Sequence, residues 1–270
     1  MPDALAVIPA RWASTRFPGK VLAPLGGRPL FLWAADAARR SGAFRAVVVA
    51  TDDERVATAA REAGLAAALT SPELPSGTDR VATVARERDE GIVVGLQADE
   101  PFVDPGDLAA LVRVLADDPG AALATLARPV TRLEEYLDPN VVKVVLDEQG
   151  RALLFSRAPI PWPRDAGGGG FPPRALPDPP PLAHVGVYAW RREALLSFAG
   201  LPPAPLELVE RLEQLRALAA GWAIRVLTAR GESLGVDTPA DLARAAALLA
   251  AREGAAPGSA QEPPERTRDR

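Results

Sequence analysis

The chain has 270 residues, a formal net charge of −4 and 48% hydrophobic residues, which allows one large α/β domain and does not indicate a nucleic-acid-binding surface. It has no cysteine and one histidine, which excludes disulfides, cysteine-ligated zinc, thiol catalysis and a histidine-rich metal site. No apolar run reaches the ~18 residues of a membrane span and the start does not resemble a signal peptide, so we expect a cytoplasmic protein with no membrane partner.

Three short apolar runs in the first hundred residues have the character of buried parallel strands: 4–8, 46–50 and 92–96. Helix-like stretches lie between them at 29–42 and 52–64, each ending in glycine. Strand alternating with helix is typical of a doubly wound, mainly parallel sheet with right-handed crossovers. We therefore expect a Rossmann-like α/β fold.

The pattern changes after residue 120, where strand-like segments follow one another at 122–130, 141–150 and 151–162. Asp-Glu-Gln-Gly at 147–150 predicts a hairpin turn between the last two. The glycine- and proline-rich stretch 165–183 predicts a mobile loop, and a further strand is expected directly after it at 184–190. We interpret residues from about 130 to 190 as an antiparallel portion inserted into the parallel fold.

In the rest of the chain, predicted helices and strands alternate again. An amphipathic helix is predicted at 205–221, a strand at 223–229 and a closing helix at 238–253, with Thr238 as its N-cap. Residues 254–270 lack apolar periodicity, so we expect a disordered tail. Residues 1–253 then form a single domain.

The stretch "PARWASTRFPGK" (9–20) is the first candidate for chemistry. Its cations and backbone N–H groups, at the end of the first strand, are suited to a polyphosphate. It contains neither GxxxxGK[ST] nor GxGxxG, so it is neither a P-loop nor a dinucleotide fingerprint. The alternative is a solvated basic loop. Lys20 stands out because 29 of the 31 basic residues are arginine and Lys143 is the other lysine.

Two aspartates are candidate metal ligands. Asp99 lies in "LQADEP" just past the third strand, and Asp237 lies in "LGVDTP" after another strand-like segment. Carboxylates at strand ends are natural oxygen ligands for Mg²⁺, so we predict that both bind one ion. The alternative is that each acid begins the next helix.

Taken together, these segments resemble the 3-deoxy-manno-octulosonate (Kdo) cytidylyltransferases, or CMP-Kdo synthetases, of the sugar nucleotidyltransferases. The resemblance runs from residue 4 to about 250 and is carried, in order, by "PARWASTRFPGK", "LPSGTDR", "LQADEP", "FSRAPIPWPRD", "HVGVY", "PLELVERLEQLR" and "GVDTP". The opening loop by itself indicates the wider family, whereas "FSRAPIP", His-x-Gly-x-Tyr and Leu-Glu-Gln-Leu-Arg in this order are narrower.

The resemblance implies a nucleotide half and a sugar half. The residues implied to bind CTP are Pro9, Ala10, Arg11, Ser14, Lys20, Ser76, Gly77 and Arg80. The residues implied to bind Kdo are Gln97, Arg157, His184, Tyr188, Glu210 and Gln214. The catalytic set is Arg11, Lys20, Asp99 and Asp237, with Mg²⁺ held by the two aspartates. Two departures from the family, Ala183 in place of arginine and Trp190 in place of tyrosine, fall on the sugar side.

The implied reaction is CTP + Kdo → CMP-Kdo + pyrophosphate, for lipopolysaccharide biosynthesis, by a homodimer joined through the inserted portion. Such chemistry depends on positioning and charge neutralisation rather than on a covalent nucleophile. The alternatives are a cytidylyltransferase for sialic acid or an amino variant of Kdo, and a non-catalytic nucleotide-binding regulator. Without the resemblance, Arg157 could pair with a neighbouring acid, His184 could be a core histidine and Glu210 could be solvated.

Overall fold

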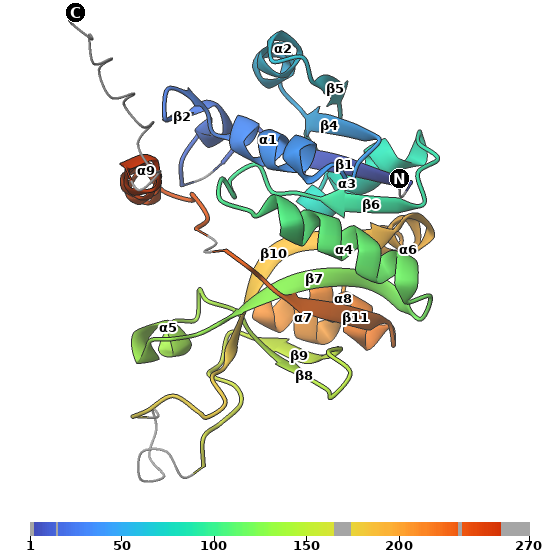
Figure 1. Ribbon diagram of the computed structural model, residues 1–270. Helices are drawn as coiled ribbons and strands as arrows, with labels where there is room; N and C mark the ends of the chain where they lie inside the picture. The colour runs from blue at the N-terminus through green and yellow to red at the C-terminus, as the bar shows by residue number, and fades with distance from the viewer. Residues whose placement is uncertain (1–2, 15, 165–173, 232–233, 255–270) are drawn as a thin grey trace, which may run out of the picture.

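The computed structural model describes residues 3–14, 16–164, 174–231 and 234–254, and within them most strands join one sheet (Figure 1). The main path across this sheet runs β11 (Ala223–Thr228), β7 (Ala121–Pro129), β10 (Leu182–Arg191), β6 (Ile92–Gly95), β1 (Ala4–Pro9), β4 (Ala46–Thr51) and β5 (Ala66–Leu69). The strands β8 (Lys143–Leu146) and β9 (Ala152–Ser156) extend it beside β10, and β2 (Pro24–Leu25) pairs separately with β3 (Arg28–Pro29).

The first half of the sheet is parallel, as the alternation of strand and helix predicted. β1 lies between β4 and β6, pairing Val7 with Val48 on one side and with Gly95 on the other. The chain therefore moves outward from β1 in one direction and then returns to its opposite side. A ligand crevice forms at such a switch point, beyond the carboxyl ends of the strands.

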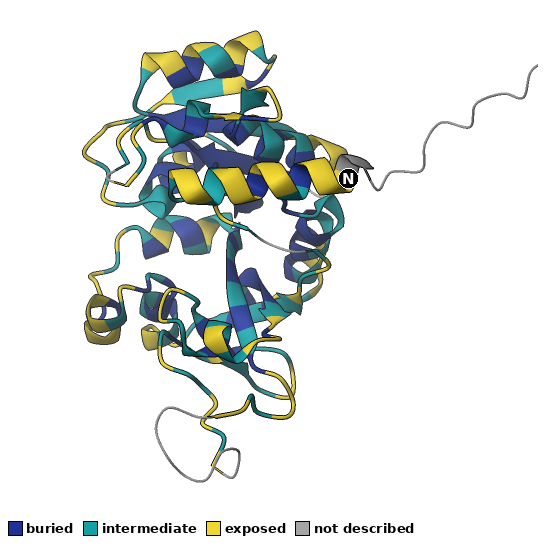
Figure 2. Ribbon diagram, turned by 90° about the vertical axis from the view of Figure 1, so that its left-hand side faces the viewer, coloured by how far each residue is buried: buried dark blue, intermediate teal, exposed yellow. Residues whose placement is uncertain are grey.

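Helices cover both faces of this sheet, whose strands are dark with buried residues in Figure 2. The helices are α1 (Phe31–Ser41), α2 (Glu54–Glu62), α3 (Gly77–Arg86), α4 (Pro105–Asp117), α5 (Leu133–Leu137), α6 (Arg192–Phe198), α7 (Pro205–Glu210), α8 (Gln214–Ala219) and α9 (Pro239–Gly254), with the 3-10 turn η1 (Lys20–Leu22). Apolar residues of α1 and α4 form one core cluster and those of α3, α6 and α8 form the other. Burial on both faces explains why the parallel strands are continuous apolar runs.

The predicted antiparallel portion is present and enters the centre of the sheet. β10 pairs antiparallel with both β6 and β7, and it also contacts β8. β8 and β9 form the predicted hairpin, whose turn places Gly150 at φ 73°, a left-handed conformation that glycine adopts without steric cost. The strand predicted at 184–190 begins earlier, at Leu182, inside the stretch expected to be a loop.

Two expectations about local structure were wrong. The helix expected at 205–221 is two short helices, because Arg211 adopts φ 54° and ends α7 before α8 begins at Gln214. Asp237 does not follow a strand, because β11 ends at Thr228 and the described residues 234–237 are an irregular connection. Residues 165–173 of the expected loop and 255–270 of the expected tail lie outside the described residues.

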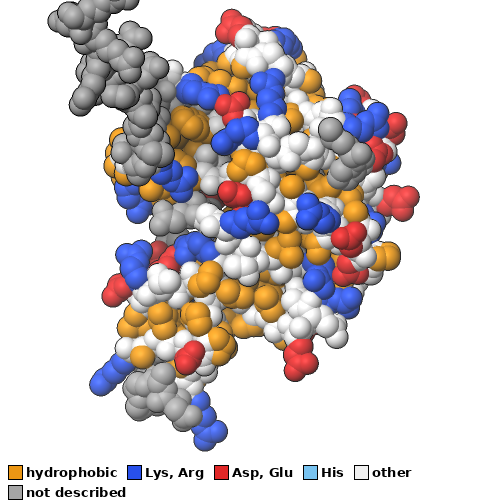
Figure 3. Space-filling model, viewed as in Figure 1, with side chains coloured by type: hydrophobic (Ala, Val, Ile, Leu, Met, Phe, Trp, Pro, Cys, Tyr) orange, Lys and Arg blue, Asp and Glu red, His pale blue; other side chains and the backbone are white. Residues whose placement is uncertain are grey.

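The visible surface carries both signs of charge. Figure 3 shows lysine and arginine interspersed with aspartate and glutamate on this face, and hydrophobic side chains gathered over its lower half, where Figure 1 draws α5, β8 and β9. Among the helices in the described residues, none is both long and apolar enough to cross a membrane.

Candidate active site

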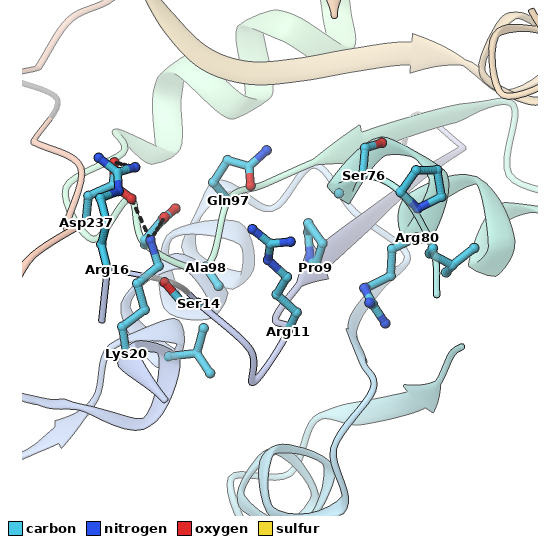
Figure 4. A pocket seen from close by; sticks show the side chains of 15 residues that line it. Pro9, Arg11, Ser14, Arg16, Lys20, Ser76, Arg80, Gln97, Ala98 and Asp237 are labelled. Carbon is cyan, nitrogen blue, oxygen red and sulfur yellow. Dashed lines mark hydrogen bonds and ion pairs between the residues drawn. The ribbon is translucent and has the colours of Figure 1, made fainter. Parts of the chain in front are cut away.

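A pocket of about 400 Å³ opens at the carboxyl ends of β1 and β6, at the switch point of the sheet (Figure 4). Its lining comes from the loop after β1, the start of α3, the segment after β6 and the connection before α9. The lining residues are Pro9, Arg11, Ser14, Arg16, Lys20, Val21, Leu74, Pro75, Ser76, Gly77, Arg80, Gln97, Ala98, Asp99 and Asp237. The fold thus brings together segments that are more than 200 residues apart in the chain.

The loop after β1 is held in place by an aromatic side chain. The Gly19 N–H donates to the Trp12 carbonyl at 3.1 Å, and Gly19 has φ 69°. The guanidinium carbon of Arg55 lies 3.5 Å from the centre of the Trp12 ring, and the Trp12 N–H donates to Asp52. This stack fixes the backbone from which Lys20 projects into the pocket.

Lys20 lies between the two predicted metal ligands. Its ammonium donates to Asp99 Oδ2 at 2.5 Å and to Asp237 Oδ1 at 2.8 Å, as the dashed lines of Figure 4 mark. Burial by itself would lower the pKa of Lys20, but the charges of Asp99 and Asp237 outweigh it and raise the pKa above its ordinary value. Arg16 adds a second cation, 2.9 Å from Asp237 Oδ2.

A backbone hydrogen bond brings the two aspartates together. The Val236 N–H donates to the Asp99 carbonyl at 2.9 Å, and the Val236 side chain is buried in a cluster with Leu25 of β2 and apolar residues of α9. Thr238 begins α9 as predicted: its hydroxyl accepts from the Asp241 N–H, and its own N–H donates to the Asp241 carboxylate. Asp237 is therefore anchored on both sides.

The start of α3 forms the opposite wall. Ser76 is its N-cap, and the first helical residue, Gly77, packs between Pro9 and Gln97. Arg80, one turn into α3, is 2% exposed and donates to Asp52 at 3.2 Å. Burial lowers the pKa of Arg80, with the aspartate opposing this effect. The helix start offers free N–H groups to an anion, and Arg80 adds a fixed positive charge.

Several predicted sugar-side residues lie along β10 and α8. His184 Nε2 is 2.9 Å from the Thr125 hydroxyl, and its ring lies between Phe155 and Tyr188. Burial lowers the pKa of His184 to about 3, so the imidazole is neutral near pH 7. Gln214 is buried at the start of α8. Of the predicted sugar residues, Gln97 alone is among the lining residues of the pocket.

Arg157 and Glu210 are joined to each other by hydrogen bonds. Glu210 accepts hydrogen bonds from the Ser156 hydroxyl at 2.6 Å and from the Arg157 N–H at 3.0 Å. The Arg157 guanidinium donates to the carbonyls of Glu210 and Pro139. In this arrangement both side chains tie the end of β9 to α7, and their predicted contact with the sugar stays a prediction.

The sequence reasoning did not single out Glu213. This carboxylate accepts from Ser76 at 2.9 Å and from Thr78 at 2.6 Å, so it bridges α8 to the pocket wall. Burial raises its pKa, and its negative charge adds to burial in raising the pKa of Tyr188. It lies within the Leu-Glu-Gln-Leu-Arg motif, where the neighbouring Gln214 was the residue chosen. Ala10 is fully buried and its N–H donates to the Ala50 carbonyl, so it is not part of the lining.

A cationic cleft with paired carboxylates at the switch point of a parallel sheet defines a nucleotide-binding α/β enzyme site. Residues 5–226 match the model of the cytidylyltransferase family. The chain belongs to this family.

Two curated relatives, from Solibacter usitatus and Syntrophotalea carbinolica, are both named 3-deoxy-manno-octulosonate cytidylyltransferase. Each is 46% identical, over 92% and 90% of this chain and 94% and 97% of the relative.

Solved structures agree with this assignment. A CMP:2-keto-3-deoxy-manno-octonic acid synthetase complexed with CTP superposes with a TM-score of 0.84 at 39% identity, covering 92% of this chain and 99% of that one. A 4-diphosphocytidyl-2C-methyl-D-erythritol synthase from Anaerococcus prevotii has a TM-score of 0.59 at 11% identity, over 92% and 98% of the two chains, and shows the shared fold.

Replacement of Gly19 by alanine tests the aromatic stack. A Cβ at this position would lie 2.7 Å from the Trp12 ring, and φ 69° is already unfavourable for alanine. We expect Gly19→Ala to lower the free energy of unfolding by about 1–2 kcal/mol and to reduce kcat/KM at least about tenfold, because the loop that carries Lys20 must shift.

Gly27→Ala is the matched control, since Gly27 has φ 76° but nothing within 4 Å of an added Cβ. Because of its positive φ, Gly27→Ala should also lower the free energy of unfolding, but its kcat/KM should stay near normal. Equal kcat/KM for the two variants, measured beside urea unfolding, would show that the Trp12 contact does not position the loop.

Proposed function

We propose that this enzyme activates 3-deoxy-manno-octulosonate with CTP, forming CMP-Kdo and pyrophosphate for lipopolysaccharide biosynthesis. The observation that carries the proposal is the single pocket that collects Arg11, Lys20, Arg80, Asp99 and Asp237 at the switch point. Family membership and the names of the relatives at 46% identity support the cytidylyl donor and the sugar acid. We also propose that the reaction takes place in the cytoplasm, as expected from the sequence.

The chemistry follows from the charges of the pocket. The anomeric hydroxyl of Kdo attacks the α-phosphorus of CTP, the bond to pyrophosphate breaks, and the hydroxyl proton passes to solvent. Negative charge moves toward the leaving pyrophosphate during this step. Arg11, Lys20 and Arg80, with the N-terminus of α3, supply positive charge that is already in place before the reaction. Such preorganised charge stabilises the transition state more than the ground state.

The two aspartates fit a magnesium ion. Oxygens of Asp99 and Asp237 converge on one cation, since both lie within 2.8 Å of the Lys20 ammonium. No group of three or more metal-ligating side chains occurs within the described residues. Mg²⁺ is commonly held by one or two carboxylates, with phosphates and water completing its shell. When bound, it would withdraw charge from the α-phosphate and make the attacking hydroxyl more acidic.

A pyrophosphate-release assay with CTP tests the proposed activity. Kdo, its amino variant and sialic acid are offered separately, because a related sugar acid is the nearest alternative. We expect kcat/KM for Kdo to exceed that for sialic acid by at least about a hundredfold. Faster turnover of another acid would change the assigned substrate, and no turnover of any acid by folded enzyme would favour a non-catalytic nucleotide-binding regulator.

The carboxylates are tested by Asp99→Asn and Asp237→Asn. Each substitution keeps the shape of the side chain but removes the charge that would hold Mg²⁺, so kcat should fall by about two orders of magnitude or more. Thermal unfolding should show that both variants fold. Near-normal turnover of either variant at limiting Mg²⁺ would contradict the assignment of that residue as a ligand.

We also propose a homodimer. Hydrophobic side chains are exposed on β9 and α7, which are joined through the hydrogen bonds of Glu210. They are Leu153 (62% exposed), Leu206 (46%), Leu208 (53%) and Val209 (81%). Large apolar side chains exposed on and beside the inserted portion are suited to contact with a second copy.

Sedimentation of Val209→Asp tests the dimer. A carboxylate in an apolar interface would be desolvated, so we expect a dimer for the unmodified chain and a monomer for this variant. Leu69→Asp is the control, because Leu69 is 58% exposed on the far edge strand β5 and should leave the dimer intact. A monomeric unmodified chain would refute the proposal.

A further inference from the structure

Lys20 occupies the space that a metal ion held by Asp99 and Asp237 would need. Its side chain is 12% exposed, and its ammonium lies 2.5 and 2.8 Å from one oxygen of each aspartate. An ammonium this close to both occupies the space between the carboxylates. Mg²⁺ bound to the same two oxygens would lie about 2 Å from each of them. The two cations therefore cannot occupy this space together.

Charge balance points the same way. The two negative charges of Asp99 and Asp237 face two positive charges, those of Lys20 and Arg16. This group of four is neutral, so it attracts a divalent cation far less than two unpaired carboxylates would. Arg16 is the more easily displaced of the two cations, since its side chain is 64% exposed.

The attachment of Lys20 allows its ammonium to move while its backbone stays fixed. The backbone is anchored by the Trp12 stack and by η1, whose Ala23 N–H donates to the Lys20 carbonyl. The flexible four-carbon stem lets the ammonium swing within the pocket. Arg11 and Ser14 line the same pocket, so a triphosphate held there would offer the ammonium new oxygen partners.

We propose that Lys20 keeps the metal site closed until the nucleotide arrives: the triphosphate draws the ammonium away from Asp99 and Asp237 and thereby opens their oxygens to Mg²⁺. This inference rests on the proposed function of the two aspartates as metal ligands. Binding of CTP and Mg²⁺ is then coupled through one side chain, and each ligand increases the affinity for the other. The order of assembly is nucleotide first, metal second.

The composition of the chain provides a direct test by NMR. Lys20 and Lys143 are its two lysines, so protein labelled with ¹³C-lysine gives two sets of side-chain signals. Lys143 is an internal reference, because it is fully buried and donates to the carbonyls of Asp138, Val141 and Arg157. Lys20→Met assigns the signals by removing one set.

We expect CTP, added with a chelator and no metal, to shift the Lys20 signal while the Lys143 signal stays in place. Magnesium chloride alone, at about 1 mM, should leave both signals unchanged. The proposal is overturned if CTP leaves the Lys20 signal where it was, or if Mg²⁺ alone shifts it as CTP does.

Calorimetric titration of the nucleotide-free enzyme with magnesium chloride provides the second measurement. Removal of the competing ammonium in Lys20→Met should tighten Mg²⁺ binding at least about tenfold. Arg16→Gln removes the exposed cation instead and should change the affinity by less than about threefold. Equal or weaker Mg²⁺ binding by Lys20→Met would refute the closed-site proposal.

A double variant separates this proposal from the function on which it rests. Asp99→Asn in the Lys20→Met background should abolish the gain in Mg²⁺ affinity. An unchanged gain would mean that the metal binds elsewhere, so that the assignment of the aspartates fails. If the double variant loses the gain in Mg²⁺ affinity but CTP does not shift the Lys20 signal, the aspartates remain the metal ligands. The proposal that Lys20 closes their site until CTP binds is then refuted.

Discussion

Two carboxylates that repel each other are held side by side at the edge of this sheet, and the arrangement of the pocket depends on that constraint. Asp99 follows β6, whereas Asp237 precedes α9, and the hydrogen bond from the Val236 N–H to the Asp99 carbonyl joins the two segments. Burial of Val236 beside α9 supports this joint. The unfavourable pair is stable because Lys20 and Arg16 supply equal positive charge, and a site of this kind is poised to exchange one set of cations for another.

The residues predicted to bind the nucleotide and those predicted to bind the sugar are held differently. On the nucleotide side, Asp52 holds the Arg80 guanidinium and the Trp12 stack holds the backbone of the Lys20 loop, so both are fixed in advance, whereas the Lys20 ammonium can move. Among the predicted sugar residues, Arg157 donates to the backbone carbonyls of Glu210 and Pro139. The departures from the family at Ala183 and Trp190 also fall on β10, which carries the predicted sugar residues His184 and Tyr188.

Local patterns predicted β1, β4 and β6 and the helices α1 and α2, because strands buried on both faces must be continuously apolar and glycine follows each of these two helices. They did not mark β5, which is half exposed, or α3 and α4, which do not end in glycine. They failed where distant contacts decide the structure. Arg211 adopts a left-handed conformation that no local signal marks, since glycine is the usual residue there, and the predicted helix is broken as a result. Asp237 does not follow a strand; it is positioned by the hydrogen bond from the N–H of its neighbour Val236 to the Asp99 carbonyl. Glu213 was overlooked because a glutamate on an amphipathic helix resembles solvated surface until its partners on α3 are known.

The central position of β10 has a consequence for how the chain folds during synthesis. Within the described residues, β10 is the strand that joins the parallel half to β7 and β11, yet it is made about ninety residues after β6. Until Leu182–Arg191 leaves the ribosome, the edge of the apolar strand β6 that faces away from β1 has no partner strand. An unpaired apolar edge is a template for association with other chains. The late strand thus fills the middle of the sheet, and the rate at which it arrives sets how long the nascent chain is exposed to aggregation.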